Sequence, residues 1–257
     1  MRPRLREKEA EISVCGWQSV QALFERHPDQ IKRLFFDAST GKRAGKLCSY
    51  IAQRRKVYRQ LPRDELERVA GTVHHGGIVA VIAERPLHGV TPEVLDRWAM
   101  ARMPLLVLDR VSNANNLGAI VRTAAFFGVR VIVVPDHASQ ALPGDAAWRV
   151  AEGGMEFVEF YRVPVLEDFC ALIKRAYFLV GTSLSGDPVD PTVNQSGSRP
   201  VALVLGNEEH GIAPEVAAAC DRLVKISGAR AIQSLNVSAA AAVLCWELFG
   251  GNSYQRR

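Results

Sequence analysis

The sequence lacks any long uncharged apolar run. No stretch approaches the roughly 18 apolar residues that a membrane-spanning helix needs. The first residues, Met1–Glu11, alternate arginine, lysine and glutamate where a secretion signal would carry an apolar segment. We therefore expect a cytoplasmic protein with no membrane partner.

Paired metal or disulfide ligands are also missing. The five cysteines are odd in number and widely spaced, and none forms a C-x-x-C pair, which argues against a disulfide framework or a zinc site. The histidines lack paired spacing. We expect reduced thiols and no metal.

The composition is that of a globular protein, with 48% hydrophobic and 23% charged residues. A chain of 257 residues exceeds one ordinary domain of about 100 to 200 residues, so two unequal domains are expected.

Positive charge is concentrated near the N-terminus. Residues 1–60 hold 14 Lys and Arg against 6 Asp and Glu, whereas the remainder holds 18 against 21. The basic clusters are Lys42, Arg43 and Lys46, followed by Arg54, Arg55, Lys56 and Arg59. Such clusters can bind phosphates, or they can form an ordinary solvated basic face.

The pattern predicts a small α/β domain at 11–85, a linker at 86–102 and a larger α/β domain at 103–250. In the linker, Thr91 is expected to cap a helix at Pro92–Ala101. Ser183–Pro200, rich in Gly, Pro, Ser and Asp, is expected to be a surface loop.

In the larger domain, short apolar segments alternate with helical segments, which is typical of a parallel sheet flanked by helices. The expected strands are Leu105–Leu108, Val131–Val134, Phe178–Gly181, Val201–Leu205 and Leu223–Ile226. The expected helices are Asn116–Phe127, Leu166–Ala176, Pro214–Cys220 and Asn236–Phe249.

Ligands bind at the carboxyl ends of such strands, and three of these junctions are unusually polar. The first runs from Asp109 to Gly118 and leads into a helix carrying Arg122 among apolar neighbours. A buried arginine needs a hydrogen-bond acceptor, so one interpretation is that Arg122 points at an RNA phosphate or a reacting ribose. The alternative is that Arg122 is an ordinary exposed arginine of the helix.

The second junction, Gly206–Gly211, is neither a Walker loop nor a G-x-G-x-x-G turn. Its Glu208 either accepts a hydrogen bond from RNA or another side chain, or it belongs to an ordinary acidic turn. The third junction leads to Ser234 and Asn236, either of which could simply cap the last helix.

Together, N-N-L-G-A-I-V-R, L-G-N-E-E-H-G and S-L-N-V-S resemble the three motifs of the SpoU family, the TrmH-type 2′-O-ribose RNA methyltransferases. The resemblance covers about residues 103–250. Residues 11–85, ending in H-G-G-I-V-A, are similar to the family's ribosomal-protein-like substrate-binding domain.

The resemblance implies a parallel sheet whose C-terminal segment forms a deep trefoil knot that holds S-adenosylmethionine. It also implies a homodimer acting on rRNA or tRNA, with the last helix and the knot face at the interface. Trp246, Leu248 and Phe249 fit such an apolar surface, and ordinary core packing is the alternative for each of them. His74–His75 is expected to be structural or to face the RNA. The implied cofactor-binding residues are Thr182, Leu205, Gly206, Asn207, Ile226 and Leu235.

The implied catalytic residues are Arg122, Asn116, Glu208, Ser234 and Asn236. Because a guanidinium stays protonated in proteins, Arg122 is expected to stabilise phosphate or a developing alkoxide, although the resemblance also allows a base role assisted by an RNA phosphate.

Two departures from the family pattern bear on activity. Asn113–Ala114 stands where the family commonly has Asp-Pro, which removes a proline that would fix one φ angle, and A-E-G-G at 151–154 replaces a more usual small-residue segment.

Two alternative functions remain at this point. One is a knotted RNA-binding or assembly protein without turnover, which would be recognised by a failure to bind cofactor. The other, a nicotinamide-dependent oxidoreductase, lacks its glycine fingerprint here.

Overall fold

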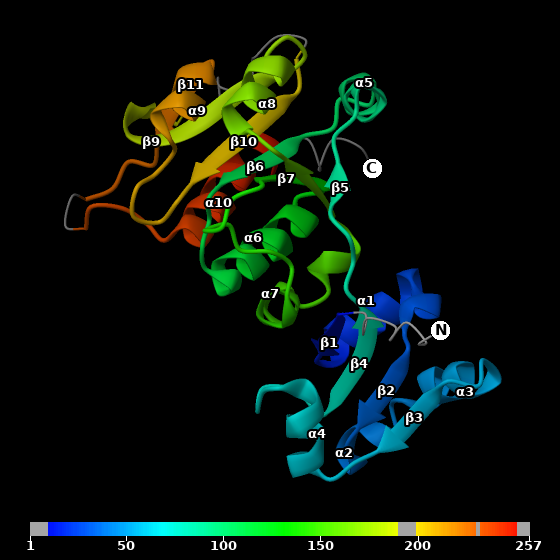
Figure 1. Cartoon of the computed structure of the whole chain (residues 1–257). Coiled ribbons are helices and arrows are strands. Elements are labelled where there is room, and N and C mark those ends of the chain that lie inside the picture. Colours follow the sequence, from blue (N-terminus) through cyan, green and yellow to red (C-terminus); the bar gives the residue numbers. More distant parts are fainter. Residues whose placement is uncertain (1–9, 190–198, 230–231, 251–257) are drawn as a thin grey trace, which may run out of the picture. The chain divides into compact units, whose positions relative to one another are not determined.

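The structure is a computed structural model, and it describes residues 10–189, 199–229 and 232–250. The chain folds into two compact units (Figure 1). One comprises the chain up to Pro86 together with Gly144–Glu156. The other comprises Leu87–Pro143 and the chain from Phe157 onward.

The first unit is built on a four-stranded sheet in the order β1-β4-β2-β3. Strand β4 pairs antiparallel with β1 and β2, and β3 extends the edge parallel to β2. The strands are β1 (Glu11–Cys15), β2 (Arg33–Phe36), β3 (Val57–Gln60) and β4 (Ile78–Ala83). The helices are α1 (Trp17–Arg26), η1 (Pro28–Gln30), α2 (Ala38–Gly41), α3 (Gly45–Gln53) and α4 (Arg63–Ala70).

The segment Gly144–Glu156 completes this unit from far along the chain. It forms α7 (Asp145–Ala151) and η2 (Gly154–Glu156). The fully buried Glu156 carboxylate accepts from Arg85 Nη2 at 2.8 and 2.9 Å and lies 2.5 Å from His27 Nδ1. Two cationic or potentially cationic partners thereby compensate one buried carboxylate.

The second unit is built on a seven-stranded sheet in the order β11-β9-β10-β6-β7-β8-β5. Every neighbouring pair in it is parallel. The strands are β5 (His88–Gly89), β6 (Leu105–Asp109), β7 (Val131–Pro135), β8 (Glu159–Val163), β9 (Phe178–Pro188), β10 (Val201–Gly206) and β11 (Arg222–Lys225). The expected parallel sheet flanked by helices is confirmed.

Helices cover both faces of this sheet (Figure 1). Leu105 and Val107 of β6 belong to a core cluster with residues of α5, α8 and α9. Because successive side chains of a strand point to opposite faces, Leu106 and Leu108 face α6 and α10, which pack together. The helices are α5 (Pro92–Met100), α6 (Ala114–Phe126), α8 (Leu166–Ile173), α9 (Pro214–Ala219), α10 (Val237–Cys245) and the π-helix η4 (Trp246–Gly250).

Two local expectations have clear outcomes. The Thr91 hydroxyl accepts from Val94 N and caps α5, as expected. The surface-loop expectation for Ser183–Pro200 is wrong in its first part, because β9 continues to Pro188 and pairs with β11 after a register shift. Residues 190–198 of that segment lie outside the described residues.

No helix in the described part of the chain is both long and apolar enough to cross a membrane.

Candidate functional site: a cavity at the carboxyl edge of the parallel sheet

The three polar junctions follow β6, β10 and β11, which lie in one parallel sheet, so all three emerge at the same edge. A cavity of about 620 Å³ opens among the last two of them and residues 182–185 in the middle of β9. The residues expected at the site that line it are Thr182, Leu205, Gly206, Asn207, Glu208, Ile226, Ser234, Leu235 and Asn236.

Gly206 allows the second junction to fold back on itself. A Cβ at this position would lie 2.2 Å from the carbonyl carbon of Gly211, so a side chain cannot fit. Asn207 and Gly211 exchange backbone N–H···O bonds of 3.0 and 2.9 Å just beyond it. The close approach that this glycine permits is therefore to the backbone of its own loop.

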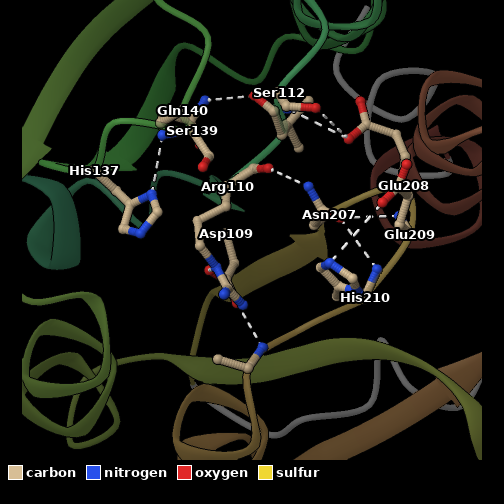
Figure 2. A network of polar contacts seen from close by, with 12 residues as sticks. Asp109, Arg110, Ser112, His137, Ser139, Gln140, Asn207, Glu208, Glu209 and His210 are labelled. Carbon is tan, nitrogen blue, oxygen red and sulfur yellow. Dashed lines mark hydrogen bonds and ion pairs between the residues drawn. The ribbon is translucent and has the colours of Figure 1, made fainter.

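The Asn207 side chain uses both ends of its amide to shape this loop. Its Oδ1 accepts from the N–H groups of Glu209 and His210 at 2.9 and 3.1 Å. Its Nδ2 donates to the carbonyl oxygen of Arg110 at 2.8 Å (Figure 2). Asn207 thus links the loop after β10 to the loop after β6.

A chain of side-chain hydrogen bonds joins the three junctions. Asn116 Nδ2 donates to Glu208 Oε1 at 2.8 Å, and Asn236 Nδ2 donates to Asn116 Oδ1 at 3.1 Å. Asn116 does not line the cavity itself, but its amide connects two residues that do. The structure therefore brings together these three of the five expected catalytic residues, and Ser234 lines the same cavity.

Glu208 is held as a carboxylate. Burial raises the pKa of Glu208, but hydrogen bonds from Asn116 and from backbone N–H groups outweigh this effect and lower the pKa below its ordinary value of 4.5. Its Oε2 also accepts from the N–H and hydroxyl of Ser112, both at 3.3 Å. At neutral pH, Glu208 is therefore an acceptor that orders its neighbours.

Two asparagines act as helix caps in addition. Asn113 Oδ1 accepts from the N–H groups of Asn115 and Asn116 at the start of α6. Asn236 Oδ1 accepts from Ser238 N at 2.8 Å at the start of α10. The capping interpretation of Asn236 is confirmed, and its Nδ2 makes the further contact with Asn116.

Arg122 lies elsewhere on α6. The buried residues of that helix, Leu117, Ile120, Val121 and Ala124 among them, form one stripe, and Arg122 falls outside it and is exposed. The expectation that apolar neighbours surround Arg122 is therefore wrong, because they face the core and it does not. Arg122 is not among the described residues that line the cavity.

Sequence reasoning missed the role of Asp109, Arg110 and Gln140. Asp109 is only 3% exposed, pairs with the Arg110 guanidinium and accepts from Ala213 N at 2.6 Å. The buried Gln140 donates through Nε2 to the carbonyl oxygen of Val111 at 3.2 Å. The one feature of the sequence that could have pointed to this role is that Asp109, a carboxylate, directly follows the four apolar residues Leu105–Leu108.

Of the two adjacent histidines, His75 is buried in the first unit. Its Nδ1 accepts from Gly77 N at 3.1 Å, which stabilises the turn before β4. The structural interpretation of His75 is thereby supported.

Comparisons with known proteins match both units. The sequence model described as the SpoU rRNA Methylase family matches residues 103–246, and the model for RNA 2′-O ribose methyltransferase substrate binding matches residues 13–88.

Two curated relatives match nearly the whole chain. The protein named "Uncharacterized tRNA/rRNA methyltransferase YfiF" of Escherichia coli O157:H7 is 35% identical over 251 residues, covering 96% of this chain and 70% of that protein. The 23S rRNA (guanosine-2′-O-)-methyltransferase RlmB of Acinetobacter baylyi is 34% identical over 237 residues, covering 90% of this chain and 94% of that protein.

Among solved structures, the SpoU methyltransferase AviRb of Streptomyces viridochromogenes in complex with AdoMet has a similar fold. The TM-score is 0.74 and the identity 24%, with 95% of this chain and 92% of that chain covered.

Proposed function

Because the chain belongs to the SpoU rRNA methylase family and is an S-adenosylmethionine-dependent RNA 2′-O-ribose methyltransferase, we propose that its cavity holds the cofactor. The observation that carries this assignment is that all six residues expected to bind cofactor line one cavity. Those residues come from three segments of the chain, namely β9, the end of β10 with the residue after it, and the segment between β11 and α10.

The chemistry of the cavity fits the cofactor. Its volume of about 620 Å³ falls in the range of small-molecule sites. Leu205, Leu235 and Val237 offer apolar contacts to an adenine ring, and the backbone near Gly206 offers hydrogen-bonding groups to its edge. When bound, S-adenosylmethionine supplies a methyl group already activated on a sulfonium.

We propose that Asn116, Glu208, Ser234 and Asn236 arrange the acceptor ribose beside this cavity. The ionised Glu208 fixes the Asn116 amide, and Asn116 in turn accepts from Asn236. A side chain held by two partners loses little freedom when substrate arrives, so the 2′-hydroxyl meets a preorganised surface.

Arg122 is the proposed catalytic cation. A guanidinium is a poor base because it stays protonated, so Arg122 would stabilise the RNA phosphate or the developing alkoxide. Its exposure on α6 leaves the side chain accessible to a macromolecular substrate.

We propose that residues 11–85 form the RNA substrate-binding domain, joined by a linker at 86–102 to a methyltransferase domain at 103–250. The basic clusters between Lys42 and Arg59 support this role, since no carboxylate interrupts them. Arg43 lies 4.2 Å over the Trp17 ring and Arg54 lies 3.5 Å over the Tyr50 ring. Arginine-capped aromatic rings of this kind offer stacking surfaces for unpaired bases.

We further propose a homodimer that works in the cytoplasm. The Phe127 ring contacts the rings of Phe126 and Trp246, where α6 ends and η4 begins. Phe126 is 83% exposed and Trp246 is 56% exposed. An exposed aromatic cluster of this kind is suited to a subunit interface. Leu248 and Phe249 are buried in the core, in agreement with the core-packing alternative for these two residues.

A deep trefoil knot is part of the same proposal. The segment between β11 and α10 contributes Ile226 and Leu235 to the cavity wall formed by the loop after β10, which is the juxtaposition that such a knot requires.

The test is methyl transfer with purified full-length protein, labelled S-adenosylmethionine, and 23S rRNA or tRNA as acceptor. The modified 2′-hydroxyl is mapped by resistance to alkaline cleavage. Arg122→Ala is expected to lose turnover while retaining cofactor binding, whereas Arg130→Ala, which removes an exposed arginine beyond α6, should keep both. Near-normal turnover of Arg122→Ala would exclude its proposed role.

The alternative of an RNA-binding protein without turnover is not favoured by the relatives named as methyltransferases. It would regain support if the purified protein took up no S-adenosylmethionine with or without RNA.

A further inference from the structure

Two consecutive residues at the end of β6 contact both ends of the loop that follows β10. We call this loop, Asn207–Ala213, the cofactor loop, because its residues 207–212 line the cavity. In the parallel register, Asp109 lies directly opposite Gly206, the residue before the loop. The end of β6 is therefore the nearest fixed point for the loop.

The Asp109 carboxylate holds the far end of the cofactor loop. Its Oδ2 accepts from Ala213 N at 2.6 Å, where the loop turns into α9. The same carboxylate receives Arg110 Nε on Oδ1 at 2.7 Å and Arg110 Nη2 on Oδ2 at 3.2 Å. Because Asp109 is buried, these partners replace the water that an ionised carboxylate otherwise needs.

The Arg110 backbone holds the near end. Its carbonyl oxygen accepts from Asn207 Nδ2 at 2.8 Å (Figure 2). The backbone φ of Arg110 is +58°, in the left-handed region that residues other than glycine seldom adopt. Such a conformation persists when its surroundings fix it, and here the bidentate pair with Asp109 and the bond from Asn207 do so.

We propose that Asp109 and Arg110 are positioning residues that hold the cofactor loop in the shape that binds S-adenosylmethionine. The inference rests on the proposed function of the cavity. A loop that is already ordered does not subtract its ordering cost from the binding free energy, so the two contacts raise cofactor affinity without touching the cofactor. They also fix the turn that leads to Ser112, two residues after Arg110, which contacts Glu208.

The alternative is that the buried ion pair serves the stability of the fold alone. The two roles separate in a variant that keeps both backbone contacts and removes the ion pair. In Asp109→Asn/Arg110→Gly, the asparagine Oδ1 still accepts from Ala213 N. The glycine adopts a φ of +58° without a side-chain clash and still presents its carbonyl to Asn207.

The experiment compares full-length wild type, Asp109→Ala, Asp109→Asn/Arg110→Gly and the control Asp136→Ala by calorimetry with S-adenosylmethionine. Asp136 is a carboxylate at the end of the neighbouring strand β7, with its side chain 64% exposed. We expect Asp109→Ala to raise the Kd about tenfold or more, and the double variant to stay within roughly threefold of wild type. The control should bind as wild type does.

Amide hydrogen exchange in the cofactor-free protein provides the second measurement. Asp109→Ala is expected to speed exchange at Glu209, His210 and Ala213, with strands β6 and β10 unchanged, whereas the double variant should keep the wild-type rates. If Asp109→Ala does not fold, Asp109→Ala/Arg110→Gly replaces it, because this variant also lacks the contact with Ala213 but leaves no unpaired guanidinium and no side chain at φ +58°. We expect it to bind S-adenosylmethionine about tenfold more weakly than Asp109→Asn/Arg110→Gly, and equal binding would overturn the inference.

Unchanged affinity and exchange in a folded Asp109→Ala protein would overturn the inference. The inference would also be overturned if Asp109→Asn/Arg110→Gly bound S-adenosylmethionine as weakly as Asp109→Ala, because the double variant retains both contacts with the loop. Failure of the wild type to bind S-adenosylmethionine would refute the proposed function instead, and the exchange rates would still decide whether these residues hold the loop.

Discussion

Removing the Glu156 carboxylate is expected to detach the segment Gly144–Glu156 from the first unit. The carboxylate is fully buried and contacts both Arg85 and His27. Arg85 also lies 4.8 Å over the ring of Trp148 in the same segment, so loss of the carboxylate removes the partner that orients this guanidinium.

The magnitude follows from the exposure of the partners. Breaking a buried ion pair typically costs about 3 to 5 kcal/mol, because the remaining charge stays buried. Here the Arg85 and His27 side chains are 29% and 40% exposed, so both regain water when the carboxylate is lost. We therefore expect Glu156→Ala to lower the free energy of unfolding by about 3 kcal/mol, at the low end of that range. The isosteric Glu156→Gln keeps an acceptor oxygen and should cost about 1 to 2 kcal/mol.

The assay is urea unfolding followed by tryptophan fluorescence, with limited proteolysis of residues 144–156 in parallel. Trp148 is 2% exposed, so release of the segment changes its share of an emission that comes from four tryptophans, and the proteolysis assigns that change to residues 144–156. Glu67→Ala is the matched control, because Glu67 pairs with Arg63 on the surface of α4 and such a pair is worth roughly 0.5 kcal/mol. A Glu156→Ala protein with the stability of wild type, or a control that loses as much, would refute the reasoning.

Three further predictions concern the second unit. Burial raises the pKa of Glu208, but hydrogen bonds lower it below 4.5 overall. The stabilisation that the Glu208 carboxylate gives the folded site is therefore complete at neutral pH and is lost as the pH falls through the lowered value. A cofactor affinity, measured by calorimetry, that already declines near neutral pH would contradict this. Gln140→Met removes one of the two donors to the Val111 carbonyl oxygen and leaves the Ala141 N–H, so it should raise the KM for RNA roughly fivefold with little change in cofactor Kd, and an unchanged KM would count against a role for this side chain. Trp246→Glu places a charge in the exposed aromatic cluster and should reduce the mass measured by light scattering from dimer to monomer, whereas a stable dimer would locate the interface elsewhere.

The parallel sheet could be predicted because its central strands are buried on both faces and read as continuous apolar runs. Val131–Pro135 and Val201–Gly206 match their expected segments to within a residue at each end. Strands at or near a sheet edge carry no such signal. The edge strand β3 reads Val-Tyr-Arg-Gln and is exposed throughout. Strand β8, which lies next to the two-residue edge strand β5, reads Glu-Phe-Tyr-Arg-Val, so its apolar run is only two residues long. Neither strand was expected.

The site was predictable only as a set of positions. The motifs identify Asn116, Glu208 and Asn236, and burial and capping in the structure account for why those residue types suit their places. Their pairing depends on which strands are neighbours and in what register. The contact of Asp109 with Ala213 spans 104 residues and follows from the register of β6 against β10, which the local sequence does not encode.

The division of the chain between its units has a consequence for synthesis on the ribosome. The chain passes between the units at Pro86, Pro143 and Glu156, so the smaller unit is incomplete until well past the midpoint of the 257 residues. Until Glu156 leaves the exit tunnel, Arg85 lacks its carboxylate partner and His27 lacks its hydrogen-bond partner, and the face that α7 later covers stays open to solvent. The nascent N-terminal sheet therefore stays exposed to water until a segment arrives whose first codon, that of Gly144, lies 61 codons after that of Ala83, the last residue of β4.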